Sequence, residues 1–471
     1  MIRYLIAKEL TYNLLTFRFL AGLVFVLLVF FASSVIFCSK FENELSEYQK
    51  AQQLYREGLE SGRTGLANLF AETIPLTKEP RITSLFATGR EERYPETIVV
   101  SAGSPQRGSL FAGMRLDTQR RNYKLERYTE FDWVFLIGVI LSFLAIVFSF
   151  DGVSRDREDG TLKLQLSNSL PRSHLLFAKY LAIVVLLLIP IALGLFVNMA
   201  IVRLLLGQDI LLSFPLQVIM VSAISVLYLS LFVWPGLWIS SSVSKSSTSL
   251  AILLLLWTFF VILAPYLGGM IAQQLYPVAS KELHEKQFKA VVDEMFSLAP
   301  KEYLDFYRGK ESNEGWKAIG KYFDVADATM EKFVLNRFTE LSSQAMMAER
   351  FNLLSPFSSF RHGMEQASNT GLVYHKEFFL SAVRYRHEIK DFIRKQDLLD
   401  PQSKHRVYYI QRMQSISDKS IDPQNVPRFT SPHMDISINL QNALPSVLVL
   451  LLFNSVCFSL ATLAFSRFDV R

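Results

Sequence analysis

The sequence predicts a mainly α-helical, polytopic membrane protein with six transmembrane helices, an N-terminal interfacial helix and two extracytoplasmic domains. Of its 471 residues, 50% are hydrophobic, and the mean hydropathy is positive at +0.24. The apolar residues form runs of roughly 20 residues without a charge, the length that crosses a hydrocarbon core about 30 Å thick. A soluble protein of this size would instead distribute them periodically along its helices and strands.

The composition also excludes several classes of function. The net charge is +6, and no basic run is interleaved with aromatic residues, so we expect no nucleic-acid binding. Cys38 and Cys457 lie in or beside apolar runs, so we expect them to pack in the core and to form neither a disulfide nor a metal site. No charged residue or histidine lies in the centre of a predicted span, and such residues usually mark ion pathways. We therefore expect neither a proton-coupled transporter nor a cation channel.

The first 15 residues predict an amphipathic helix that lies at the membrane interface. Apolar residues recur at helical spacing along one stripe, at Ile2, Leu5, Ile6, Leu10 and Leu14. Charged and polar residues occupy the positions between them, as in helices that lie in the headgroup region. No small-residue cleavage site follows the next apolar run, so we interpret that run as the first span and not as a signal peptide.

The remaining segments follow from the positions of the apolar runs. Trp133 suits an interfacial position at the start of the second span, and Arg203 marks the end of the third. In chain order we predict the interfacial helix (1–15), the first span (16–39), extracytoplasmic domain 1 (40–131), the second span (132–150), a cytoplasmic loop (151–174), the third span (175–206), the fourth (211–240), the fifth (247–272), extracytoplasmic domain 2 (273–442), the sixth span (443–466) and a cytoplasmic tail (467–471).

The two long polar segments predict domains of different kinds. In the first, helical spacing continues over residues 41–59, and residues 97–101 predict a strand among Pro- and Gly-marked loops, so we expect an α+β domain. The second is predicted to be mostly helical, with helices over 282–307, 327–351 and 376–394. The apolar stretch 353–357 is expected to touch the outer leaflet.

The short loops determine the predicted orientation. In a six-span chain their basic residues fall on one side, together with the 151–174 loop: Arg3, Lys8, Arg18, Lys245, Arg467 and Arg471. The positive-inside rule then places both termini and the loop in the cytoplasm and both long polar segments outside. We therefore expect a multi-pass protein of a bacterial-type inner membrane.

The sequence contains no evident catalytic site. Residues 315–322, GWKAIGKY, approach the phosphate-binding pattern GxxxxGK[ST], but Tyr322 replaces the hydroxyl residue that would hold magnesium and no apolar strand precedes it. The seven histidines show no metal-ligand spacing. We expect no enzymatic activity and no cofactor or metal in this chain.

The most distinctive segment is 151–179, DGVSRDREDGTLKLQLSNSLPRSHLLFAK, between the second and third spans. It contains a dense mixed-charge cluster, Arg155, Asp156, Arg157, Glu158 and Asp159. Gly160 is predicted to end a helix, because glycine adopts a positive φ without steric cost. Pro171 forms a second break, because it disfavours helix at the residue before it. A short charged helix between two breaks suits docking to a protein and not burial in lipid.

This segment resembles the signature of ABC-2-type transporter permeases. The family pattern is a charged cluster ending in Glu-x-Gly-Thr-Leu, a break around a proline, and Gly-Lys before the next helix. REDGTL (157–162) matches the first part, and Ser167, Pro171-Arg172 and Lys179 match the rest, with Ala178 in place of the glycine and an additional Ser-Leu pair before the proline. The six spans, the N-terminal helix and the terminal FSRFDVR also resemble the branch named for multicopper-enzyme maturation and gliding-type exporters, which carries large extracytoplasmic insertions.

The resemblance implies a coupling helix over 157–170 that fits a groove on a separate cytoplasmic ABC ATPase. The residues expected to serve ATPase coupling are Arg155, Arg157, Glu158, Asp159, Gly160, Thr161, Leu162, Pro171, Arg172 and Lys179. Mixed charges agree with this role, because they give orientation-specific pairing. The resemblance further implies an exporter permease that works with a second permease chain and two ATPase copies, ATP and Mg being bound by the ATPase.

Other interpretations of these features stay open at this point. The charge cluster is also typical of a solvated loop that follows the positive-inside bias. A second function is mechanotransmission, in which ATP hydrolysis moves the large outer domains to control an envelope protein without transport. A membrane anchor or sensor is a third, although it would not need the charged loop. The sequence identifies neither the substrate nor whether the permease dimer is homomeric.

Overall fold

The computed structural model describes residues 2–89, 97–102, 131–162, 171–302, 305, 312–403, 416–432 and 434–467. Within these residues, six helical stretches are long and apolar enough to cross a membrane. We call them spans 1 to 6: Phe17–Thr64, Trp133–Glu158, Arg172–Leu206, Pro215–Ser242, Ser246–Leu275 and Ile436–Ser466. The prediction of a mainly α-helical, polytopic membrane protein with six transmembrane helices is confirmed.

Several spans consist of more than one helical element. Span 1 contains α2 (Phe17–Glu60) and the short turn η1 (Ser61–Thr64). Span 2 contains α6 (Trp133–Phe135), the π-helical η4 (Leu136–Leu141), α7 (Ser142–Ser149) and α8 (Ser154–Glu158). Span 5 contains α13 (Ser246–Trp257), the π-helical η5 (Thr258–Leu263) and α14 (Ala264–Leu275). Spans 3, 4 and 6 are α10 (Arg172–Leu206), α12 (Pro215–Ser242) and α20 (Ile436–Ser466), and α11 (Ile210–Ser213) lies between the first two of these.

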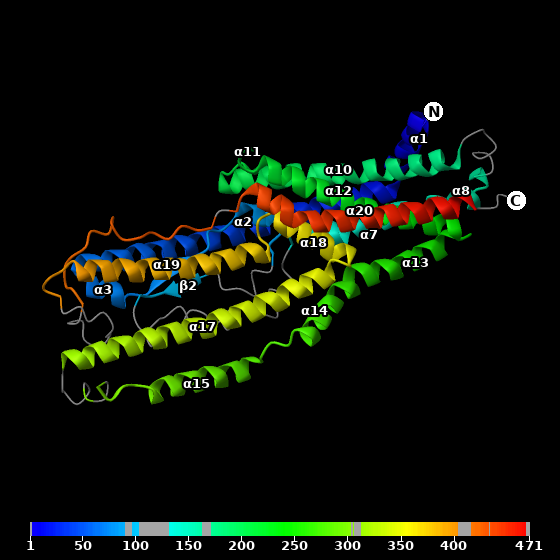
Figure 1. The fold of residues 1–471 in the computed structure, drawn as a ribbon. Coiled ribbons are helices and arrows are strands. Elements are labelled where there is room, and N and C mark those ends of the chain that lie inside the picture. Colours follow the sequence, from blue (N-terminus) through cyan, green and yellow to red (C-terminus); the bar gives the residue numbers. More distant parts are fainter. Residues whose placement is uncertain are drawn as a thin grey trace.

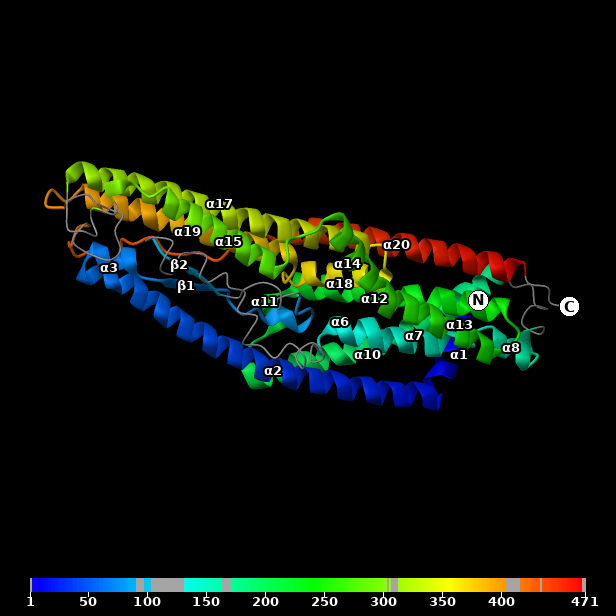
Figure 2. The ribbon, with the colours of Figure 1, turned by 90° about the horizontal axis from the view of Figure 1, so that it is seen from below.

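The molecule is elongated, with the spans bundled at one end and long helices extending from the other (Figure 1). Both chain termini and α8 lie at the same extreme of the bundle, which we call the loop end; Figure 2 shows the same arrangement from below. One buried apolar cluster joins all six spans, with members Phe30, Leu141, Leu186, Tyr228, Leu253 and Leu450. The bundle is therefore a single packed unit.

The predicted N-terminal helix is α1 (Ile2–Leu14), and it is followed by a sharp turn into span 1. The hydroxyl of Thr16 accepts a hydrogen bond from the Phe19 backbone N–H and so caps α2. One side of α1 packs against α10. Tyr4 and Leu15 are 83% and 82% exposed, as expected for apolar side chains that enter the headgroup region.

The elements at the far end form what we call the polar body. They are the part of α2 beyond the bundle, α3 (Leu66–Ala71), β1 (Ile74–Thr77), η2 (Ile82–Leu85), β2 (Thr97–Val100), α15 (Lys281–Ser297), α17 (Asn313–Asn352) and α19 (Leu372–Leu398). Strands β1 and β2 pair antiparallel, with Ile74 opposite Val100. β2 coincides with the strand predicted from the sequence. This small sheet accounts for the predicted α+β character of the first polar segment.

The two polar segments, which the sequence analysis treats as separate domains, share one core. A single buried cluster contains Leu59 and Ile74 from the first segment together with Phe338 and Phe378 from the second. Backbone hydrogen bonds also join them, from Ile421 N–H to the Gly62 carbonyl and from residues 66 and 67 to the segment around residue 418. The core of the polar body is therefore built from chain regions that are more than 200 residues apart.

The second polar segment also re-enters the bundle. α18 (Pro356–Ala367) packs against α12 and α20, and Phe360 and Met364 are fully buried in the cluster of the spans. The Phe360 ring stacks on Tyr228 with a centroid distance of 4.2 Å. The sequence predicted that residues 353–357 touch the membrane surface, but the helix that follows is an integral part of the bundle. Hydropathy does not indicate that α18 belongs to the bundle, because the helix contains many polar residues.

Buried polar side chains join the spans at defined points. Asn198 in span 3 donates to the Phe30 carbonyl and contacts the Ser34 hydroxyl in span 1, and it accepts from the Trp133 indole in span 2. Asn454 in span 6 accepts from the Ser230 hydroxyl in span 4. Such bonds satisfy polar groups that would otherwise lie unpaired in an apolar medium.

Gly236 allows spans 2 and 4 to approach each other closely, and it supplies a first prediction. A Cβ atom there would overlap the Ser149 side chain, whereas a Cβ at Gly269 in span 5 meets nothing within 4 Å. We expect Gly236→Ala to destabilise the solubilised protein by about 1–3 kcal/mol through overpacking. Gly269→Ala is the matched control and should unfold at the wild-type temperature in a thermal scan monitored by size-exclusion chromatography. Equal unfolding temperatures for the two variants would contradict the close packing.

Candidate functional site: the loop between spans 2 and 3

The charged cluster of the loop forms its own short helix, α8 (Ser154–Glu158). Gly160 follows with φ of +71°, as its predicted role as a helix stop requires, and nothing lies within 4 Å of a Cβ built on it. The predicted continuous helix over 157–170 is therefore wrong in its first part, because the turn at residues 159–160 interrupts it. The rest of that range, residues 163–170, lies outside the described residues.

One side of α8 is bonded to the turn between spans 4 and 5. The Arg157 guanidinium donates to the carbonyls of Ser241 and Val243 at the end of α12, at 3.1 and 2.9 Å. The Glu158 carboxylate accepts from the backbone N–H and the hydroxyl of Ser246 at the start of α13, at 2.8 and 3.0 Å. The two charges thus satisfy the unpaired backbone groups of two helix ends, each with the sign that the helix dipole favours.

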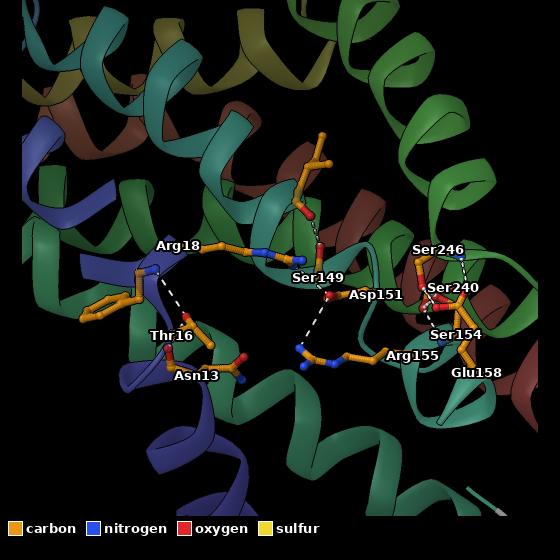
Figure 3. Close-up of polar contacts among 12 residues, drawn as sticks. Asn13, Thr16, Arg18, Ser149, Asp151, Ser154, Arg155, Glu158, Ser240 and Ser246 are labelled. Atoms are coloured by element: carbon orange, nitrogen blue, oxygen red, sulfur yellow. Dashed lines mark hydrogen bonds and ion pairs between the residues drawn. The ribbon is translucent and has the colours of Figure 1, made fainter. Parts of the chain in front are cut away.

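Serine hydroxyls strengthen this junction (Figure 3). The Ser240 hydroxyl accepts from the backbone N–H groups of Val153 and Ser154, at 2.9 and 2.8 Å. The Ser154 hydroxyl lies 2.9 Å from that of Ser246. The start of α8 and the turn between spans 4 and 5 are therefore held as one unit.

A buried ion-pair cluster connects α8 to α1 and span 3. Lys179 lies about two turns after the start of α10, and its side chain is only 5% exposed. Its ammonium group lies 3.1 Å from the Glu9 carboxylate of α1 and 2.7 Å from the Asp156 carboxylate of α8. A buried cation attracts two partly buried carboxylates strongly, so this contact fixes three elements together.

Further contacts reach the start of span 1. Asp151 pairs with Arg18 of α2 at 2.8 Å and lies 4.0 Å from Arg155 (Figure 3). The Arg155 guanidinium also lies over the Tyr12 ring of α1, 4.9 Å from its centroid. A displacement of α8 would therefore act on both helices of the N-terminal region.

Of the remaining predicted site residues, some contact other parts of the bundle and others are exposed. Leu162 is buried, and Arg172 donates to the Ser466 carbonyl at the end of span 6, at 2.9 Å. Asp159, Gly160 and Thr161 form the exposed tip of the loop, with Asp159 61% exposed and 3.7 Å from Arg155. Pro171 is exposed at the start of α10. The described residues of the loop and Arg172 thus contact α1 and spans 1, 3, 4, 5 and 6, while residues 159–161 stay exposed.

The sequence analysis missed the partners of these residues. They are Glu9, Arg18, Asp151, Ser240 and Ser246. The turn at 240–249 is rich in serine, a helix-capping residue, and this is a sequence signal for polar contacts at the ends of spans 4 and 5. The ion pairs of Glu9 and Arg18 join residues that are distant in sequence, so no local pattern indicates them. Among the described residues, no group of three or more His, Cys, Asp or Glu residues could hold a metal ion.

Comparison with known families shows to which family this chain belongs. The model of the family described as ABC-2 family transporter protein matches residues 5–470. The chain belongs to the ABC-2 transporter family. No curated protein matches it. The ABC-2 assignment makes the chain a membrane permease subunit of an ABC transporter, a class that associates with a cytoplasmic ABC ATPase and has no ATPase site of its own.

Proposed function

We propose that this ABC-2 permease couples ATP hydrolysis by a separate cytoplasmic ATPase to the export or extraction of a substrate, and that α8 and the exposed tip after it receive the ATPase. The observation that supports this most is the connection of α8 to α1 and to spans 1, 3, 4 and 5 by the contacts described above. A force applied to the tip would reach most of the bundle. A solvated loop would not need buried partners on several sides.

The proposed complex contains a second permease chain and two ATPase copies, with ATP and Mg bound by the ATPase. It lies in a bacterial-type inner membrane, with both termini and the loop end in the cytoplasm and the polar body outside. The location of both termini beside α8 supports this topology, because an even number of spans returns the chain to its starting side. The basic residues of the loop end agree with it.

The tip supplies the second prediction. Asp159→Arg with Thr161→Arg places two cations where the wild type has one exposed anion and one neutral side chain, and it removes only exposed contacts of α8, the Asp159–Arg155 ion pair and the hydrogen bonds from the Thr161 hydroxyl to Asp156. We expect an ATPase to co-purify with the C-terminally tagged wild type and its yield to fall at least about ten-fold in the variant, because like charges across an interface are strongly unfavourable.

Arg203→Glu is the control, because Arg203 is an exposed cation whose ion pair joins it to Asp209 in the linker at the opposite end of span 3. This variant should retain the ATPase. If no ATP-binding protein co-purifies with the wild type, the coupling proposal fails and a membrane anchor or sensor becomes the better interpretation. If the ATPase binds the double variant as well as the wild type, the tip is not the docking site.

A second function, mechanotransmission to an envelope protein, is favoured by one observation. α2 is a continuous 44-residue helix that runs from Phe17, beside the Arg18–Asp151 pair at the loop end, into the core of the polar body at Leu59. Because a helix of this length without a break moves as one rigid element, a tilt at its Phe17 end also moves its Glu60 end. A substrate-sized cavity between spans 2 and 5 of the assembled dimer would favour transport instead.

A further inference from the structure

Spans 2 and 5 each contain one π-helical segment, and a hydrogen bond joins the two residues directly next to these segments. η4 ends at Leu141, directly before Ser142, and η5 begins at Thr258, directly after Trp257. The Trp257 indole N–H donates to the Ser142 hydroxyl at 2.9 Å. Single π-helical turns are uncommon and occur frequently at functional sites. Because spans 2 and 5 run in opposite directions, both segments lie on the same side of this one hydrogen bond, toward the polar body, which indicates a particular role for this contact.

Neighbouring elements bond to the backbone of both π-helical segments. The Tyr228 hydroxyl of span 4 donates to the Gly138 carbonyl in η4 at 2.9 Å. The Ser355 hydroxyl, at the start of α18, donates to the Phe260 carbonyl in η5 at 3.1 Å. Because a π-helical turn displaces its carbonyls from the regular ladder, these side chains can hold it in place. The crossing point of spans 2 and 5 is thus fixed from two further sides.

Away from this point, each half of span 5 is attached to a different part of the molecule. The inner half, α13, is capped by Glu158 of α8. The outer half, α14, packs along α17, where Gly268 allows the close approach of Asn352. The Gln344 side chain of α17 also donates to the Tyr276 carbonyl at 2.6 Å. Figure 1 shows α14 continuing from α13 toward α17, away from the remaining spans.

The apolar part of span 5 has few contacts within the chain. Only 11% of its most apolar 18-residue window is buried, the same share as in span 6, compared with 61% for span 2. A helix with few side contacts and one fixed crossing point can pivot about that point more easily than a helix packed along its length.

We propose that Trp257 and Ser142 are positioning residues that form the pivot of span 5, so that a displacement of α8 is passed through α13 and α14 to α17. This inference rests on the proposed coupling function and specifies the route by which the coupling reaches the polar body. The inner arm of 12 residues is about 18 Å long, and the 40 residues of α17 extend about 60 Å. A helix shift of about 2 Å at the loop end would therefore become a shift of about 2 Å where Gly268 of α14 meets α17, because the outer arm from Trp257 to Gly268 is about as long as the inner arm.

The test measures a distance across the polar body in the purified permease–ATPase complex. Spin labels are attached to Leu54→Cys in α2 and Val325→Cys in α17, which are 56% and 58% exposed, in a Cys38→Ala, Cys457→Ala background. Double electron–electron resonance is recorded without nucleotide and with ADP–vanadate. We expect a nucleotide-dependent shift of about 2 Å, from the arm lengths above. Trp257→Phe and Ser142→Ala should each abolish it, because either change removes the hydrogen bond.

The variants distinguish the loss of the pivot from a general loss of stability. The double variant should behave like each single variant, because both remove the same bond. Phe143→Leu is the control: it removes a ring contact with Trp257 at 5.7 Å but leaves the hydrogen bond intact, and it should keep the shift. All variants should still bind the ATPase and hydrolyse ATP.

Each other outcome has a definite meaning. A shift that persists in Trp257→Phe overturns the pivot. A wild-type complex that binds the ATPase and hydrolyses ATP without any shift also overturns it, while the proposed coupling function stands. Failure of any ATPase to co-purify refutes the proposed function itself, and the pivot inference fails with it.

Discussion

Lys179→Met is expected to lower the free energy of unfolding by about 2–3 kcal/mol, because it leaves two partly buried carboxylates without their shared, buried cation. The Lys179 side chain is 5% exposed, and those of Glu9 and Asp156 are 15% and 21% exposed. Thermal unfolding of the detergent-solubilised protein, followed by size-exclusion chromatography, measures the effect. Since the cluster joins α1 and α8 to span 3, we also expect the variant to lose the co-purifying ATPase.

Arg203→Met is the matched control for this experiment. Arg203 also pairs with one carboxylate, that of Asp209 at 2.7 Å, but its side chain is 72% exposed. Exposed pairs contribute only about 0–1 kcal/mol, so this variant should be nearly as stable as the wild type. Adding Glu9→Gln and Asp156→Asn to Lys179→Met should restore part of the lost stability, because it removes the uncompensated charges. Equal stability of the two single Met variants would show that the buried cluster is not formed.

Arg386→Met is expected to have a larger effect in the polar body, about 3–5 kcal/mol. The Arg386 side chain is 1% exposed; it contacts the Asp327 carboxylate and lies 2.9 Å from that of Glu331, both on α17. It thereby joins α19 to α17. Arg384→Met is the control, because Arg384 is 61% exposed and lies 3.9 Å from Glu377. Chemical unfolding of the two variants compares them, and a stable Arg386→Met protein would contradict the packing of α17 on α19.

The same ion pair predicts a pH dependence. Burial raises the pKa of Asp327, but Arg386 and Lys390 outweigh it and hold this pKa below its ordinary value of 3.8. A carboxylate whose pKa is lower in the folded state stabilises the protein above its unfolded pKa, and this contribution is lost as the pH falls through the folded value. We therefore expect the wild-type polar body to lose this stabilisation only below about pH 3.8, and Arg386→Met, whose Asp327 pKa is less depressed, to lose less stability over the same acid range.

The features that could be predicted from the sequence depend on local patterns. Membrane crossing requires about 20 consecutive apolar residues, so a hydropathy argument finds all six spans. The stop at Gly160 also follows from a property of the residue itself, and φ of +71° agrees with it. The strand at Thr97–Val100 could be recognised for the same reason, because β-branched residues cluster there.

The features that could not be predicted depend on contacts between distant residues. Arg157 and Glu158 suggested docking to a partner, but in the structure they cap α12 and α13, about 85 residues away along the chain. α18 contains Arg361, His362 and Glu365, and only its position against Tyr228 shows that it belongs to the bundle. The π-helical segments have no reliable signal in sequence, although Pro265, which cannot donate to the carbonyl four residues earlier, marks the end of η5.

The shared core of the polar body has a consequence for how the protein is made. Leu59 and Ile74 are synthesised early, whereas Ile421 and Val426, which complete the same cluster, leave the ribosome only after five spans have been inserted. The first polar segment therefore has to wait, partly unfolded, for most of the chain to be translated. We expect this segment to be insoluble or protease-sensitive when expressed alone. Truncation before residue 416 should expose it to quality-control proteases even when the first five spans are correctly inserted.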